Sequence, residues 1–161
     1  MERKYDDWTE GDDRYTTKAT ISNNTDFDSF VKALKSVDMS IGLDELEETT
    51  VFIPTNEAFE KLNDRHLAAL KTPDKGKSMT ELLKYHMVPE EYEISTLRST
   101  VKLNEGVLRL KTAQGAYLAF SIQNDQLMIT DEMGTTTEIK LPDIETSNGV
   151  VHGIDDLLML Q

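Results

Sequence analysis

The stretch TVFIPTNEAFEKL at residues 50–62 decides the predicted fold, because it sets an uncharged strand directly before a short helix. The run 49–53 is β-branched and aromatic, which is typical of a strand buried in a core. Pro54 ends this strand, since proline has no N–H to donate to a β-ladder. Thr55 is then expected to cap a helix whose Phe59 faces inward. We expect the following residues of this stretch to be structural: Phe52, Pro54, Thr55, Asn56 and Phe59.

Two further helices are predicted, one on each side of this stretch. Their apolar residues recur at the spacing of one helix face, at Phe27, Phe30, Val31 and Leu34, and again at Met79, Leu82, Leu83 and His86. Asn24 or Thr25 can cap the first helix, and a serine three residues before Glu81 gives the second a capping box. Pro89 is expected to stop the second helix.

From Thr100 onward the apolar residues alternate with polar ones, which predicts strands. The alternating positions are Val101 and Leu103; Leu108 and Leu110; Leu118, Phe120 and Ile122; Leu127 and Ile129; and Ile139 and Leu141. Asn148 and Gly149 form the strongest hairpin signal, because both residue types tolerate a positive φ. Helices in the first half and strands in the second predict an α+β fold rather than a parallel βαβ sheet.

Length and charge restrict the organisation and the partners. The chain has 161 residues, enough for one well-buried core, and no cysteine. Residues 1–18 are acidic without a helix or strand period, so we expect a flexible or loosely docked tail followed by a single domain at 19–161. The tail lacks the apolar stretch of a signal peptide. The formal net charge of −13 argues against nucleic acid as a partner, and no apolar run is long enough for membrane insertion.

Three segments, taken in order, resemble the fasciclin (FAS1) domain family. Residues 50–62 resemble its first signature stretch, LLKYHMVP at 82–89 its central Tyr-His segment, and DIETSNGVVHGID at 143–155 its second signature stretch. The resemblance implies a compact wedge of β-strands packed with several helices, in which the two signature stretches are neighbouring core strands. Gly153 departs from the family, which usually has a bulky aliphatic residue there, and leaves a gap that a neighbour must fill.

The resemblance also implies a function. Fasciclin domains serve in adhesion, usually outside the cytoplasm, on cell surfaces or in matrix, and they occur in bacteria as well, where a periplasmic location is an option. We therefore expect a non-catalytic, extracellular, cell-surface or periplasmic module that needs no cofactor. Its expected partner is a cell-surface or matrix protein or a glycan, with weak homo-oligomers as an option.

Tyr85 and His86 correspond to a pair proposed to contact receptors in animal members of the family. His86 shares the helix face of Leu82 and Leu83, so we expect it to be a neutral core histidine with a hydrogen-bond partner. Tyr85 lies one position round the helix and is expected to expose its hydroxyl, which makes it a candidate partner contact.

Asp143 and Ile144 match a short motif proposed for integrin contact in animal members. The structural alternative is that Ile144 is a core position and that Asp143 caps a turn beside Pro142. Further along, Asn148 and Gly149 are expected to make the turn. His152 shares a strand face with Val150 and Ile154, which predicts a core or core-edge histidine with its hydrogen bonds satisfied.

No catalytic pattern accompanies these motifs. The sequence lacks a Gly-x-Ser-x-Gly elbow and a His-Glu-x-x-His pair, and its three histidines are scattered. Two alternatives to adhesion remain from the residues alone. One is a carboxylate- or metal-dependent hydrolase whose acids converge from distant positions, and the other is an intracellular interaction protein.

Overall fold

The computed structural model describes residues 20–21, 24–36, 48–60, 81–146 and 149–159. The tail predicted over 1–18, the start of the second predicted helix and Asn148 lie outside the described residues. The elements in chain order are η3 (Thr25–Phe27), α2 (Asp28–Ser36), β1 (Thr49–Pro54), α3 (Asn56–Glu60), β2 (Met87–Val88), α6 (Ile94–Leu103), β3 (Leu108–Lys111), β4 (Tyr117–Gln123), β5 (Gln126–Thr130), β6 (Thr136–Thr146) and β7 (Gly149–Ile154). Residues 81–85 are also helical. This order confirms the α+β fold with early helices and later strands.

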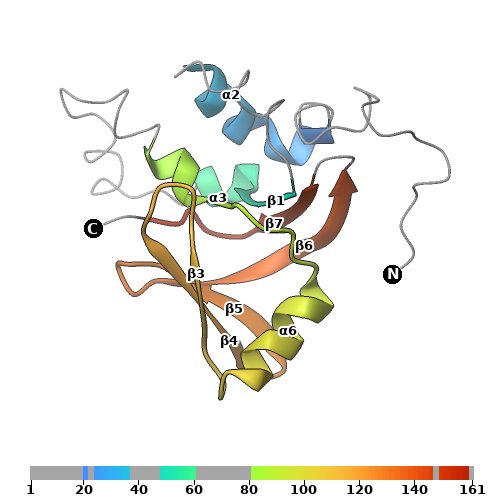
Figure 1. Cartoon of the computed structure of the whole chain (residues 1–161). Helices are drawn as coiled ribbons and strands as arrows, with labels where there is room; N and C mark the ends of the chain where they lie inside the picture. Colours follow the sequence, from blue (N-terminus) through green and yellow to red (C-terminus); the bar gives the residue numbers. More distant parts are fainter. Residues whose placement is uncertain (1–19, 22–23, 37–47, 61–80, 147–148, 160–161) are drawn as a thin grey trace, which may run out of the picture.

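Among the described residues, seven strands form one sheet in the order β2-β1-β7-β6-β5-β4-β3 (Figure 1). Neighbouring strands are antiparallel except β1 and β7, which run parallel. Beyond β3, the Ala113 N–H donates to the carbonyl of Met87 in β2 at 2.8 Å. The two end strands of the sheet therefore approach each other at this point, and the sheet is rolled rather than open.

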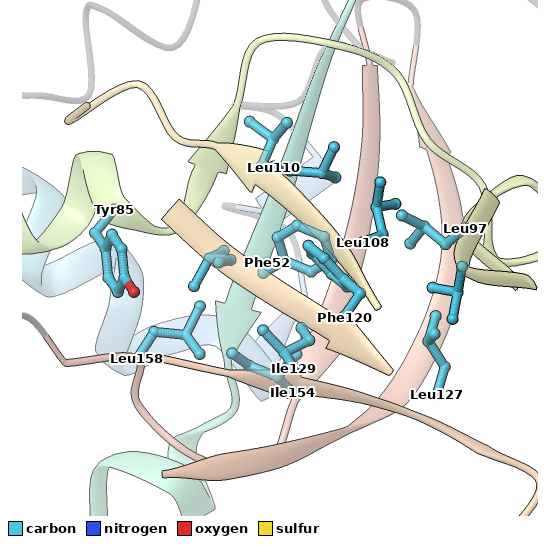
Figure 2. Close-up of a cluster of buried hydrophobic side chains, with 13 residues drawn as sticks. Phe52, Tyr85, Leu97, Leu108, Leu110, Phe120, Leu127, Ile129, Ile154 and Leu158 are labelled. Atoms are coloured by element: carbon cyan, nitrogen blue, oxygen red, sulfur yellow. The ribbon is translucent and has the colours of Figure 1, made fainter. Parts of the chain in front are cut away.

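Two hydrophobic clusters lie on the two sides of the rolled sheet. The larger one fills the inside, with the Phe52 and Phe120 rings 5.5 Å apart near its centre (Figure 2). Leu97 of α6 and Leu127 of β5 lie together at one margin of this cluster in the same view. The second cluster packs the apolar face of α2, including Phe30, against β1 and β7. The helix face predicted for α2 is thus confirmed, and β1 is buried along its whole length between the clusters.

The strand predicted to begin at Thr100 is wrong, because Val101 and Leu103 belong to α6. Leu97 and Val101 are buried four residues apart on the inner face of α6, whereas Leu103 is 83% exposed at its end. The sequence shows no local cap for this helix. Its Ile94 N–H is instead bound at 2.8 Å by the carboxylate of Asp143, a residue far along the chain.

The helix expected to run to Pro89 ends earlier than predicted. Residues 87 and 88 form β2, which pairs with Thr50 and Val51 of β1, and Pro89 is exposed beyond it. Pro89 therefore ends a short edge strand rather than a helix. The hairpin predicted near Asn148 is confirmed by the pairing of Thr146 with Gly149 between β6 and β7.

Candidate functional site

The two segments that resemble signature stretches form adjacent parallel strands in the middle of the sheet. β1 and β7 pair in register from Thr49 opposite Gly149 to Pro54 opposite Ile154. Phe52 is fully buried, and its ring stacks on that of His152 with centroids 5.5 Å apart. The adjacency expected from the sequence is confirmed, and Pro54 is the last residue of its strand as predicted.

The two residues after β1, Thr55 and Asn56, form hydrogen bonds to the helices that follow and precede this strand. The backbone carbonyl of Thr55 accepts from the N–H groups of Ala58 and Phe59, and its hydroxyl oxygen also accepts from Ala58, so Thr55 caps α3 as predicted. Asn56 reaches a different element. Its amide donates to the Thr25 carbonyl at 2.7 Å and its side-chain oxygen accepts from the Ser29 N–H at 2.9 Å.

Asn56 thus holds the start of α2 against α3, which explains the need for an amide side chain with one donor and one acceptor. Phe59, the inward residue of α3, is half-buried and packs against the second hydrophobic cluster.

Two glycines of β7 are required by close packing. A Cβ on Gly149 would lie 2.1 Å from the Thr49 carbonyl oxygen, so the parallel strands could not pair there with a larger residue. Gly149 has no positive φ, and its expected role as a positive-φ turn residue is therefore wrong. At Gly153 a Cβ would meet the side chain of Leu141 at 2.9 Å. Leu141 thus fills the gap that the sequence predicted.

His152 is a buried framework residue that holds three segments together. Its Nδ1 accepts from the Asp143 N–H at 3.0 Å, and its Nε2–H donates to the Tyr92 carbonyl at 2.7 Å. Because Nδ1 accepts a hydrogen bond, it carries no proton, and the ring is neutral. Burial lowers the pKa of His152, and the hydrogen bond to Tyr92 offsets part of this effect. Asp143 Oδ1 lies 4.0 Å from Nδ1, but a neutral ring makes no ion pair with it.

Asp143 occupies an irregular part of β6 where the register with β7 shifts between Leu141 and Ile144. Its φ of 55° is left-handed, a conformation that aspartate tolerates better than most residues. Oδ1 accepts from the Ile94 N–H, so Asp143 caps α6 instead of a turn beside Pro142. Its side chain remains 18% exposed. Ile144 is half-buried against the second hydrophobic cluster.

His86 is fully buried, as the helix periodicity predicts. Its Nδ1–H donates to the Leu82 carbonyl at 2.8 Å, and its Nε2 accepts from the Leu158 N–H at 3.0 Å. Burial lowers the pKa of His86 to about 4, against a partial opposing effect of the hydrogen bond to Leu82. His86 and His152 are therefore both neutral, but they carry their protons on opposite ring nitrogens.

The expectation that Tyr85 exposes its hydroxyl is wrong. Tyr85 has no exposed surface, and its hydroxyl donates to the Tyr117 carbonyl at 2.9 Å while accepting from the Glu132 N–H at 3.0 Å. Figure 2 shows its ring at the margin of the inner cluster. Burial raises the pKa of this phenol. The prediction was wrong because Tyr85 lies on the side of helix 81–85 that faces away from α2. On that side β4 and the β5–β6 loop of the rolled sheet cover it.

The sequence did not predict the buried carboxylate of Asp131. Asp131 Oδ1 accepts from the N–H groups of Met133 and Thr135, and Oδ2 accepts from the Met159 N–H, so Asp131 ties the β5–β6 loop to the C-terminal segment. The only local signal is the Asp-x-x-Gly spacing of a turn. Within the described ranges, no three histidine or acidic side chains come together as metal ligands. No helix of that part of the chain is long and apolar enough to cross a bilayer.

Comparison with known proteins agrees with this framework. The family model described as "Fasciclin domain" matches residues 25–160. Protein sll1483 of Synechocystis is 25% identical over 92% of this chain and 75% of its own length. Human periostin is 29% identical over 82% of the chain, and rabbit transforming growth factor-beta-induced protein ig-h3 is 31% identical over 89%. The chain spans only 14% and 19% of those two longer proteins.

A solved structure of a FAS1 domain pair, from the insect cell adhesion molecule fasciclin I, superimposes with a TM-score of 0.69. It shares 19% sequence identity with this chain, and the match covers 91% of this chain and 51% of the other. The family model covers most of the chain, and the paired signature strands have the expected arrangement. The chain therefore belongs to the fasciclin domain family.

Proposed function

We propose that this domain is a non-catalytic adhesion module that works at a cell surface or outside the cell and binds a protein or glycan partner. The observation that carries the proposal is the match of nearly the whole chain to a domain that occurs in a cell adhesion molecule. The geometry of the histidines supports it. Both His86 and His152 use both ring nitrogens for backbone groups inside the core, so neither is available as a general base.

The proposed contact surface is the irregular part of β6 around Asp143 and Ile144. Asp143 Oδ1 is occupied by the start of α6, which leaves Oδ2 as the carboxylate oxygen to which a partner binds. The neighbouring Lys140 and Pro142 are exposed, so the segment is accessible. Tyr85 is excluded from this surface by its burial.

Bead adhesion tests the proposal. Beads coated with the folded chain are offered to cells of the source organism and its neighbours, with heat-denatured protein as the negative control. Asp143→Asn keeps an oxygen acceptor for the Ile94 N–H but removes the charge. Asp125→Asn is the matched control, because Asp125 also has a positive φ but lies in the β4–β5 turn with a 99% exposed side chain.

We expect Asp143→Asn to abolish bead binding while Asp125→Asn leaves it unchanged. Adhesion that survives in Asp143→Asn would keep the module's function but move its contact surface away from β6. If folded wild-type beads bind no cells or matrix, adhesion itself is refuted.

A further inference from the structure

Among the described residues, no strand pairs with the outer edge of β3. β3 ends the sheet order and pairs on one side with β4. Thr112 donates its N–H to Ala116 across the hairpin, so the backbone groups of alternate residues before it, Leu110 and Leu108, also face β4. The groups of Arg109 and Lys111 then point to the outer edge.

The alternation along this edge is supported by its next member. Ala113, two residues beyond Lys111, donates its N–H outward to the Met87 carbonyl of β2. In the described part of the chain, β2 ends one residue later at Val88, and no strand continues along β3. Within the described ranges, one backbone hydrogen bond therefore joins the two end strands beyond β3, and the outward backbone groups of Arg109 and Lys111 pair with no strand.

The inner core is least covered at the same edge. Leu108 and Leu110 are 9% and 8% exposed, whereas every other buried member of the inner cluster is 3% exposed or less. Val107, the residue directly before β3, is 52% exposed. The inward residues of a strand laid along this edge would cover Leu108 and Leu110.

The outer face of the edge is basic in a strongly acidic protein. Arg109 and Lys111 are exposed on the same face of β3, and the Arg109 guanidinium lies 5.4 Å from the centroid of the Tyr117 ring. Neither β3 nor the neighbouring β4 contains an acidic residue, although the chain carries a formal charge of −13. The charge at this edge is thus opposite to that of the molecule as a whole.

We propose that the β3 edge binds an extended acidic segment of a partner protein, which adds to the sheet as a further strand. A strand is the occupant that satisfies outward N–H and C=O groups repeating every second residue. Its residues opposite Arg109 and Lys111 are acidic, and the alternate ones, beside Leu108 and Leu110, are apolar. The inference rests on the proposed function only in assuming a protein partner.

Basic residues on an edge strand also have a protective role, because they hinder edge-to-edge aggregation. Protection and recognition differ in one measurable property. A purely protective edge takes up no added strand of any charge, whereas a docking edge binds a strand with the complementary pattern.

The test uses a fluorescein-labelled eight-residue peptide of alternating glutamate and valine, titrated with the full chain and followed by fluorescence anisotropy. One control peptide carries lysine in place of glutamate, and another is N-methylated at each glutamate amide, which removes the donors for strand pairing but keeps the charge. The protein variant is Arg109→Glu/Lys111→Glu. Its matched control is Lys32→Glu/Lys84→Glu, which makes the same charge change at two exposed lysines on helices.

We expect saturable binding of the Glu-Val peptide that weakens at least tenfold with the N-methylated peptide and with Arg109→Glu/Lys111→Glu, but not with Lys32→Glu/Lys84→Glu. Thermal melts of both variants check that they fold. Absence of binding, or equal binding of the N-methylated peptide, overturns the proposal. Binding of a sulfated oligosaccharide in place of the peptide does so as well and identifies a glycan site. Because the assay contains no cells, its failure leaves the adhesion proposal standing.

Discussion

The buried histidines predict that the domain loses stability in mild acid. The pKa of His86 falls from 6.5 in the unfolded chain to about 4 in the fold, so the unfolded state binds a proton that the folded state excludes. The contribution of neutral His86 to the free energy of unfolding is present above about pH 6.5 and is lost as the pH falls toward about 4. The pKa shift corresponds to a loss of about 2 kcal/mol by pH 5 and about 3 kcal/mol by pH 4. His152 acts in the same direction.

Urea denaturation followed by circular dichroism at pH 7.5, 6 and 5 measures this loss. The comparison is with His86→Gln, because the many carboxylates and His152 titrate in both proteins and cancel. The variant is expected to be less stable at pH 7.5, since it loses part of the bonding to Leu82 and Leu158. Its loss between pH 7.5 and 5 should be smaller than that of the wild type by about 2 kcal/mol.

Parallel stability curves for the two proteins would refute the reasoning, because they would mean that His86 takes up a proton in the folded state. Nitrogen NMR of the imidazoles gives an independent check. It should show the proton on Nδ1 of His86 and on Nε2 of His152, as their hydrogen bonds require.

Four further substitutions test the framework by chemical denaturation. Gly149→Ala should cost about 3 kcal/mol, because its Cβ would collide with the Thr49 carbonyl oxygen at 2.1 Å. Gly153→Ala should cost less, about 1–2 kcal/mol, since its Cβ would overlap the Leu141 Cβ more mildly, at 2.9 Å. Equal costs would contradict this distinction. Tyr85→Phe should cost about 1–3 kcal/mol by leaving a buried N–H and carbonyl without the hydroxyl, and a neutral effect would place the hydroxyl in solvent. Phe52→Ala should cost about 3–5 kcal/mol by emptying the centre of the inner cluster, and a cost below about 1 kcal/mol would show that this site is not buried.

The sequence predicted the parts of the fold whose signals are local. The uncharged run of β1, the Thr55 cap and the apolar face of α2 each reflect neighbours within a few residues. Recognition of the signature segments added the adjacency of β1 and β7, which periodicity alone does not contain.

The errors share a physical cause, which is that the deciding partner is distant in the chain. α6 was missed because its start is capped by Asp143, 49 positions away. Tyr85 was placed on the surface because the groups that bury its hydroxyl come from β4 and the β5–β6 loop. Gly149 was correctly singled out, but its reason is the approach of the Thr49 carbonyl rather than a turn.

The central place of β7 has a consequence for how the chain folds. Thr49 pairs with Gly149, 100 positions later, and the last strand of the sequence lies between β1 and β6. The sheet therefore cannot be completed until residues 149–154 have left the ribosome. Contacts of such long sequence separation slow folding, because much loop entropy is lost before they form. A chain interrupted before residue 149 would leave the apolar β1 with an unpaired edge, and such edges recruit other strands. We thus expect shortened forms of this domain to aggregate rather than to persist as partly folded monomers.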